Sequence, residues 1–370
     1  MVWVTILIAV FYACLLGIAA GLWILHHKKS NKNPSELPDN SFSILVPFRN
    51  EAKHLGDLVQ SLNNQTQPKD RWECIFIDDH STDQSVDIIQ RTFNFKSRLI
   101  TSLGTGKKAA LVAGINEAKE DYIIQTDADC IAPDNWLSSI NQVKGDQSNV
   151  IITGPVTIQQ PNSILDHFQA MDMMAMMGMT FAGIKTGWWH MGNGANLAYP
   201  KSARINSQAA SDSDQFASGD DMFLIESAIQ NKQTKLIFNL NPEGIISTKA
   251  CPDFNSFIQQ RIRWATKNSS MKSPGLKIAL GISLGFNVLL VILLIAALIN
   301  DQWIRITVLL WIQKWIMDYV YLKSIAPFFN SKIRLPVYLV CATLYPFYVV
   351  LITLLSIFKR NYEWKGRIVR

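Results

Sequence analysis

Three long runs without a single charged residue limit what this chain can fold into. They cover residues 2–25, 278–299 and 337–358 of a chain of 370 residues. About 20 consecutive apolar residues in a helix are enough to cross the hydrocarbon core of a bilayer. Buried helices of soluble proteins seldom extend this far without a polar face. We therefore predict three transmembrane helices, the last two spanning about residues 276–300 and 336–358.

The first run is predicted to be a membrane anchor over residues 1–27 rather than a signal peptide. A secretory signal carries basic residues before a shorter apolar run, and this run has neither feature. Lys28, Lys29 and Lys32 follow the run, and positive charge gathers on the cytoplasmic side of membrane helices. We expect a multi-pass protein of the plasma membrane, with its N-terminus outside and the following domain in the cytoplasm.

A further apolar segment, residues 303–329, carries four charged residues, and we keep two interpretations of it. The charged residues are Arg305, Lys314, Asp318 and Lys323. Because charges inside a membrane are costly, the segment is either a functional span or an interfacial helix. The number of crossings favours the interfacial helix. Two spans after a cytoplasmic domain return the basic tail EWKGR to the cytoplasm, where positive charge gathers. Three spans would leave that tail outside.

The charge and the cysteines exclude two classes of protein. The formal net charge is +6, and much of the excess flanks the membrane runs. That position suits the anionic cytoplasmic leaflet rather than nucleic acid, so we predict no nucleic-acid partner. No two cysteines form a C-x-x-C pair, which argues against a zinc site or a disulfide framework. The five cysteines are Cys14, Cys74, Cys130, Cys251 and Cys341.

Residues 41–270 have the alternating pattern of an α/β domain. They follow a polar linker, residues 28–40, and precede a C-terminal membrane region, residues 271–370. Alternation of strands and helices is typical of a mostly parallel sheet, and such sheets bind ligands beyond the carboxyl ends of their strands. The predicted elements are strands at 42–48, 72–78, 97–101 and 122–127 and helices at 55–62, 85–93 and 107–118.

Polar clusters follow three of the predicted strands. They are Arg49, Asn50 and Glu51 after the first strand, Asp78, Asp79 and Asp83 after the second, and Asp127 and Asp129 at the end of the fourth. Because the carboxyl ends of parallel strands share one edge of a sheet, we expect these clusters to converge there.

Asp127 and Asp129 are two residues apart, so in an extended segment their side chains point the same way. Two carboxylates that close repel each other and favour a cation. Magnesium typically binds one or two carboxylates together with substrate phosphates. The alternative is a turn in which the aspartates cap the next helix. The companion clusters favour a metal site over this turn.

Two other segments each leave two interpretations open. GTGKKAAL at residues 104–111 is not a P-loop, because Thr101 stands where the first glycine belongs and Lys108 where Ser or Thr belongs. Lys107 therefore either contacts a diphosphate or begins a solvated helix. Asp220 and Asp221 precede a predicted helix. They either stabilise the helix by placing negative charge at its N-terminus, or one of them acts as a general base.

The segments nearest the membrane also have alternatives. Gln260, Arg263 and Trp264 come just before the second membrane run, where basic residues usually anchor a helix at the interface. Residues 169–199 contain seven methionines, a residue that fills irregular apolar space. The methionine-rich segment is either a lipid-facing groove at the membrane surface or an ordinary core helix.

Taken in order, six segments resemble glycosyltransferase family 2, a membrane-associated group with the GT-A fold. The segments are VPFRNE, IDDHSTD, GKKAAL, TDADC, SGDD and QRIRW, and the resemblance covers residues 41–268. It implies a Rossmann-like α/β domain of the nucleotide-diphospho-sugar transferase type, joined to transmembrane helices. No single segment is decisive, whereas the ordered set is specific.

The resemblance also assigns residues to a sugar-nucleotide donor. The residues that would lie near the nucleotide are Pro47, Arg49, Glu51 and Asp79. Lys107 matches the lysine of the family motif G-K-x-x-A-L. Phe48 and Arg49 replace a more usual tyrosine in the first segment, which leaves the donor preference open.

The catalytic assignments come from the remaining segments. Asp127 and Asp129 match the D-x-D that holds a divalent metal, Mg²⁺ or Mn²⁺, on the donor diphosphate. Asp221 matches the second residue of the family's acidic pair and would be the catalytic base, although Asp220 replaces the commoner glutamate. The remaining match is to Q-x-x-R-W, which lines the donor and acceptor site in the family: Gln260, Arg263 and Trp264.

The resemblance implies an inverting glycosyltransferase that moves a sugar from a nucleoside-diphosphate sugar to a hydroxyl of a lipid or lipid-linked acceptor. A small processive polysaccharide synthase of the same family is the alternative. Three spans are few for the channel that a polymer needs, so we favour single addition. A non-catalytic membrane protein that keeps the fold as a binding module is the hypothesis from another class, and the intact acidic residues argue against it.

Overall fold

The computed structural model describes residues 2–27, 38–92, 96–209, 220–230, 234–268, 273–358, 362–364 and 367–369. Most of the predicted linker, residues 28–37, lies outside the described residues. The chain divides into two compact units. We call residues 30–159, 190–249 and 363–370 the sheet unit, and residues 1–29, 160–189 and 250–362 the helical unit.

The sheet unit is built on a seven-stranded sheet of order β3-β2-β1-β4-β8-β6-β9. Its strands are β1 (Phe42–Phe48), β2 (Trp72–Asp78), β3 (Ser97–Thr101), β4 (Tyr122–Gln125), β6 (Val150–Thr153), β8 (Leu197–Pro200) and β9 (Lys235–Phe238). Every residue of β1 and β2 is buried, as expected of central parallel strands covered on both faces. A second sheet has the order β5-β10-β7, with β5 (Cys130–Ile131), β7 (Val156–Ile158) and β10 (Ile246–Thr248).

The predicted parallel arrangement is confirmed for the first four strands. β1 pairs in parallel with β2 and β4, and β2 pairs in parallel with β3. β8 departs from the pattern, since it runs antiparallel to both β4 and β6. The helices of this unit are α2 (Leu55–Asn63), α3 (Ser85–Arg91), α4 (Lys107–Glu117), α5 (Trp136–Lys144), α7 (Lys201–Ala209) and α8 (Asp220–Gln230).

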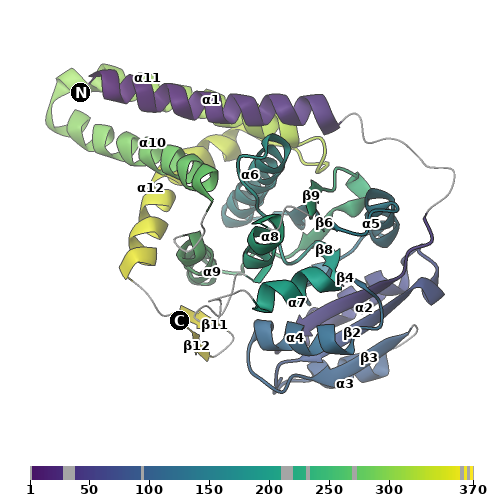
Figure 1. Cartoon of the computed structure of the whole chain (residues 1–370). Coiled ribbons are helices and arrows are strands. Elements are labelled where there is room, and N and C mark those ends of the chain that lie inside the picture. The colour runs from purple at the N-terminus through teal and green to yellow at the C-terminus, as the bar shows by residue number, and fades with distance from the viewer. Residues whose placement is uncertain are drawn as a thin grey trace. The chain divides into compact units, whose positions relative to one another are not determined.

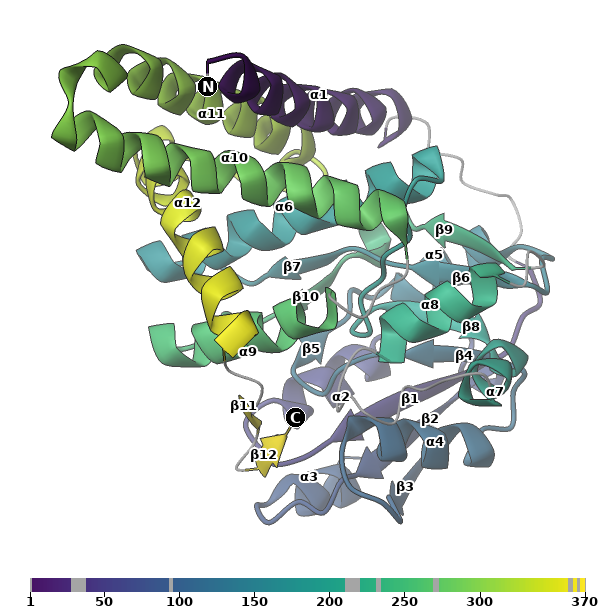
Figure 2. The same ribbon diagram turned by 60° about the vertical axis from the view of Figure 1, so that its left-hand side comes forward.

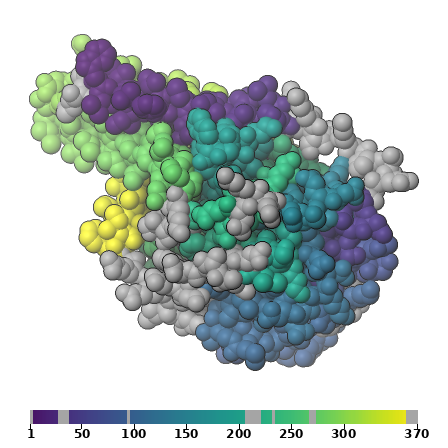
Figure 3. All heavy atoms as spheres, in the orientation of Figure 1, coloured from purple at the N-terminus to yellow at the C-terminus, as the bar shows by residue number. Residues whose placement is uncertain are grey.

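The helical unit contains the three apolar runs as helices. Its elements are α1 (Val2–His27), α6 (Ile164–Thr186), α9 (Phe254–Asn268), α10 (Pro274–Ile299), α11 (Ile304–Ile325) and α12 (Leu335–Phe358). In the described part of the chain, three of its helices are long and apolar enough to cross a membrane: residues 3–26, 274–299 and 335–358. Figures 1 and 2 show α1, α10 and α11 side by side. Figure 3 shows α1, in purple, uncovered along one face.

α6 belongs to the helical unit although it lies between two strands in the sequence. Ser163 and Asp166 begin it with a capping box, in which each side chain accepts from the other's backbone N–H. None of its methionines is exposed, and Met173, Met174 and Met177 are fully buried. Of the two interpretations of the methionine-rich segment, the structure therefore favours the core helix.

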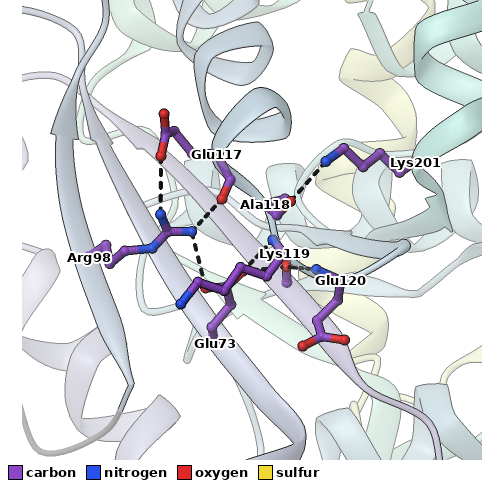
Figure 4. Close-up of polar contacts among 8 residues, drawn as sticks. Glu73, Arg98, Glu117, Ala118, Lys119, Glu120 and Lys201 are labelled. Atoms are coloured by element: carbon purple, nitrogen blue, oxygen red, sulfur yellow. Dashed lines mark hydrogen bonds and ion pairs between the residues drawn. The ribbon is translucent and has the colours of Figure 1, made fainter.

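A buried carboxylate ties the start of the parallel sheet to the end of α4 (Figure 4). Glu73 accepts hydrogen bonds from the Ser43 hydroxyl and the Lys119 N–H, both at 2.7 Å, and lies 3.1 Å from the Arg98 guanidinium. Arg98 also donates to the Glu117 carbonyl, and Lys201 donates to the Ala118 carbonyl at 2.8 Å. These two cations donate hydrogen bonds to the last carbonyls of α4 and stabilise the negative end of its helix dipole.

The Glu73 carboxylate is expected to make stability depend on pH. Burial alone raises the pKa of Glu73, but the hydrogen bonds from Lys119 and Ser43 and the charge of Arg98 lower it below its ordinary value. Because the folded pKa is depressed, the contribution to stability is present above the unfolded pKa and is lost as pH falls through the folded value.

Glu73→Gln should therefore destabilise the protein by about 1–3 kcal/mol at neutral pH, since Arg98 loses its buried anion. The variant should also lose less stability than wild type between about pH 5 and pH 3, around the ordinary glutamate pKa. Chemical denaturation monitored across that pH range measures both effects. Glu117→Gln is the matched control, because Glu117 pairs with the same Arg98 but is 54% exposed. Equal losses in the two variants would contradict the structural role of Glu73.

Candidate active site

The loops after β1 and β2 are joined by hydrogen bonds at the carboxyl edge of the sheet. The Arg49 guanidinium donates to the Asp79 carbonyl at 2.7 Å, and the Glu51 N–H donates to the Ser85 hydroxyl at 2.8 Å. Asn50 and His80, the second residues of the two loops, have φ angles of 52° and 57°. Backbone strain of this kind persists only where surrounding contacts hold it, and it gathers at functional sites.

Asp79 connects these loops to the beginning of α4. Its side chain is buried, and one carboxylate oxygen accepts from the Gly106 N–H at 2.8 Å. Gly106 has a φ of 94°, a conformation that residues with a Cβ rarely adopt. The contact places Lys107, the first residue of α4, at the carboxyl edge of the sheet.

Asp127 and Asp129 lie in a turn and not in an extended segment. β4 ends at Gln125, and the Cys130 N–H donates to the Asp127 carbonyl at 3.2 Å. The strand predicted to continue to Asp127 is therefore too long, and the same-side argument from extended geometry is wrong. The two carboxylates still act on one neighbour, because burial first and then the charges of Asp129 and Asp127 raise the pKa of the Cys130 thiol.

The carboxylate of Asp127 forms an ion pair with the ammonium of Lys107. Both side chains are about one-third exposed. This contact joins α4 to the turn after β4, two segments that the sequence treats as separate clusters. The Asp127 carboxylate is thus paired with a cation and still open to solvent.

Gly194 marks the point where the catalytic candidates converge. Its N–H donates to the Asp221 carboxylate at 2.9 Å, and its carbonyl accepts from the Gln125 side chain at 3.1 Å. A Cβ built on Gly194 would stand 3.5 Å from an Asp221 oxygen and 3.6 Å from the Lys107 nitrogen. Asp221, Lys107 and, through its ion pair, Asp127 thus surround one small volume beyond the sheet.

The loop that carries Gly194 is held by Asn196. The Asn196 side chain is buried, accepts from the Trp136 indole at 3.0 Å, and donates to the Pro155 and Gly244 carbonyls. Asn196 therefore supports the loop and does not face the site. Sequence reasoning missed Gln125, whose signal is a polar residue at the end of the apolar strand YIIQ.

The predicted site residues are divided between the two units. The sheet unit holds Pro47, Arg49, Glu51, Asp79, Lys107, Asp127, Asp129 and Asp221. Pro47 pairs with Ile77 in the ladder between β1 and β2. Gln260, Arg263 and Trp264 lie on α9 of the helical unit and are half-buried. Phe257, Ile258 and Ile262 of α9 pack into a core with residues of α6 and α12.

The carboxylates of Asp127 and Asp129 suit a metal ion that is also bound by a substrate. Among the described residues, no group of three or more His, Cys, Asp or Glu side chains could hold a metal ion. Asp127 and Asp129 offer carboxylate oxygens, which hard divalent ions prefer, and magnesium commonly takes only one or two carboxylates and completes its shell with phosphates and water. The site therefore suits Mg²⁺ or Mn²⁺ when a diphosphate is present.

Comparison with known proteins agrees with this geometry. Residues 43–203 match the sequence family described as Glycosyl transferase family 2. The probable glycosyltransferase YdaM of Bacillus subtilis is 35% identical over 107 residues, which cover 27% of this chain and 25% of that protein. The undecaprenyl-phosphate 4-deoxy-4-formamido-L-arabinose transferase of Proteus mirabilis is 29% identical over 99 residues, covering 25% and 30%. The chain thus spans less than a third of the length of these relatives.

One solved structure resembles the chain over nearly its whole length. The mannosyltransferase PcManGT from Pyrobaculum calidifontis, in complex with GDP-Man and Mn²⁺, has a TM-score of 0.54 and 16% sequence identity. The alignment covers 95% of this chain and 99% of that one. The similarity confirms the predicted GT-A fold.

Gly194→Ala should disturb the site without unfolding the protein. A Cβ at this position would stand 2.8 Å from the buried Gln125 amide, so Gln125 must move and give up its bond to the Gly194 carbonyl. Overpacking of this kind costs about 1–3 kcal/mol, which thermal unfolding of the purified protein would measure. Gly56→Ala on α2 is the control, because no atom lies within 4 Å of its Cβ position. A control that loses as much stability as Gly194→Ala would contradict the crowding.

Proposed function

We infer the function of this chain from its family: residues 43–203 belong to glycosyltransferase family 2, and we propose that the protein is a membrane-bound inverting glycosyltransferase. It would move a sugar from a nucleoside-diphosphate sugar to a hydroxyl of a lipid or lipid-linked acceptor. The observation that carries the proposal is the convergence of Lys107, Asp127 and Asp221 around Gly194 at the carboxyl edge of the sheet.

In this proposal the donor diphosphate lies between α4 and the turn after β4. Asp127 and Asp129 would hold a divalent ion, Mg²⁺ or Mn²⁺, which when bound offsets the charge that develops on the leaving nucleoside diphosphate. Lys107 would then turn from Asp127 to the phosphates, next to the positive end of the α4 dipole. Arg49, Glu51 and Asp79 would shape the nucleotide pocket through the joined loops.

Asp221 would act as the general base. It would take the proton of the acceptor hydroxyl as that oxygen bonds to the anomeric carbon, while the bond from this carbon to the diphosphate oxygen breaks. Attack from the face opposite the leaving group inverts the configuration. The Gly194 N–H, 2.9 Å from the carboxylate, would orient Asp221 for this role.

A membrane lipid suits the acceptor side of the proposal. Three described helices are apolar enough to cross a membrane, and the Proteus mirabilis relative acts, by its name, with undecaprenyl phosphate. We propose a multi-pass plasma-membrane enzyme with the sheet unit in the cytoplasm, where nucleotide sugars are made available. The parts assigned to Gln260, Arg263 and Trp264 in donor and acceptor binding remain proposals from the family motif.

The proposal predicts separate losses for two aspartates. Asp221→Asn should lower kcat by about 10²–10⁴-fold with donor binding retained, because only the proton acceptor is removed. Asp129→Ala should abolish turnover that depends on added Mg²⁺ or Mn²⁺. Release of nucleoside diphosphate from a panel of sugar nucleotides, in membranes with and without chelator, measures both, and radiolabelled product shows whether the sugar enters lipid or polymer.

Asp57→Asn serves as the control, since Asp57 is a half-exposed residue of α2 that pairs with Lys249. If Asp221→Asn turned over as fast as Asp57→Asn, the assignment of Asp221 as the general base would be contradicted. An elongating labelled product would favour the processive synthase over single addition.

A further inference from the structure

We propose that α11 is a fourth membrane-crossing helix whose exposed surface contacts lipid hydrocarbon, although its composition does not single it out as a span. Its 22 residues extend about 33 Å at 1.5 Å per residue, close to the thickness of a bilayer core of about 30 Å. The inference concerns the helical unit alone and does not depend on the enzymatic proposal.

The first observation is the direction in which α11 turns its side chains. Six apolar residues of α11 are exposed: Ile304, Val308, Leu309, Ile312, Ile316 and Val320. Val308, Ile312, Ile316 and Val320 follow one another at intervals of four, so they form one stripe along the helix. Lys314, in contrast, is completely buried, and the Asp318 side chain is only 14% exposed. Arg305 and Lys323 are exposed, but they lie in the first and last turns of α11, where charged side chains can reach the membrane surface. A helix at a water interface would also expose the charges in its middle.

The two inward charges have partners within the unit. Lys314 and Asp318 form an ion pair one turn apart, and the Tyr12 hydroxyl of α1 donates to Asp318 at 2.5 Å. The Lys314 ammonium also lies 4.9 Å from the centre of the Tyr345 ring of α12. Ionisable residues inside membranes pair with one another in this way and face the interior of the bundle.

The second observation is the alignment of α11 with two predicted spans. Gln313 donates to the Ala9 carbonyl, Tyr12 donates to Asp318, and Trp23 packs against Phe328 just after α11. Residue numbers thus rise together along α1 and α11, so the two helices run parallel. Thr307 of α11 donates to the Leu293 carbonyl of α10 at 3.1 Å, and only residues 300–303 separate these helices, so they form an antiparallel hairpin.

The charges at the helix ends agree with this arrangement. The end of α1 is followed by Lys28, Lys29 and Lys32, and the end of α11 by Lys332 and Arg334. Because α1 and α11 run parallel, both basic segments emerge on the same side of the membrane, as the positive-inside rule requires. The opposite end carries one residue of each sign, Asp301 before α11 and Arg305 in its first turn. With α12 also crossing, a crossing α11 places the basic tail EWKGR on the outer side, against the count of spans that favoured an interfacial segment. The inference is carried instead by the contacts of α11 inside the helical unit.

Single cysteines on either side of α11 test the crossing. Gln302→Cys and Lys332→Cys both replace exposed residues, in a Cys14→Ala background, since Cys14 is the exposed native cysteine among the described residues. Intact cells and permeabilised cells would be treated with a membrane-impermeant maleimide. We expect Cys at 302 to react in intact cells and Cys at 332 to react only after permeabilisation.

Reaction of the two positions from opposite sides, in either orientation, supports the crossing. Reaction of both from the same side overturns it, because an interfacial α11 leaves its two ends on one side. The Cys14→Ala parent, which keeps the other four native cysteines, gives the background signal.

A second test uses the ion pair itself. Lys314→Met leaves Asp318 without its buried cation, so we expect a several-fold loss of folded protein in membranes, read as the monodisperse fraction after detergent extraction. The double variant Lys314→Met/Asp318→Leu should recover most of that loss, because an apolar pair replaces the buried ion pair. Lys323→Met is the matched control, since Lys323 is exposed on the same helix. A Lys314→Met variant as abundant as the control would show that these charges face water, and would overturn the inference.

Discussion

The candidate site depends on how α4 is held at its two ends. At the N-terminal end, the buried Asp79 carboxylate binds the Gly106 N–H and so positions Lys107. At the C-terminal end, Arg98 and Lys201 donate to the last carbonyls, and Glu73 holds Arg98 in place. Contacts at both ends limit the movement of α4, so the backbone of Lys107 is held where its side chain can reach Asp127 and the neighbourhood of Asp221. Pre-organisation of the charged groups is what an electrostatic site requires.

The helical unit also contains buried contacts between charged side chains. Several of its charged side chains are buried and paired, while many apolar side chains of its long helices are exposed. Besides the Lys314–Asp318 pair, Arg261 of α9 lies 2.9 Å from Asp172 of α6, and both are almost fully buried. The Arg261 guanidinium also stacks at 4.2 Å on the Trp264 ring, a residue of the Q-x-x-R-W motif. Because an unpaired buried charge costs several kcal/mol, these pairs restrict how α6, α9 and α11 can pack.

Local pattern was sufficient for much of the fold. The apolar runs FSILVPF, WECIFID and SRLIT are strands with the predicted bounds, because each is a short apolar or β-branched stretch between turn residues. The predicted strand through Asp127 was too long, since turn formation at Ala128 and Asp129 overrides the strand preference of the residues before it. Gln125 and the role of Asn196 escaped notice because their partners are about 40 to 70 residues away in the chain.

The sequence by itself determined the membrane runs, the order of strands and helices and the acidic residues that follow the strands, because hydropathy and periodicity are properties of neighbouring residues. Only the tertiary structure decided which residues meet. It paired Lys107 with Asp127 and Gly194 with Asp221, assigned α6 to the helical unit, and buried Lys314 of α11 in an ion pair with Asp318. The local sequence does not indicate whether a charged side chain faces water or a buried partner. The partner is determined by how distant segments of the chain fold against each other.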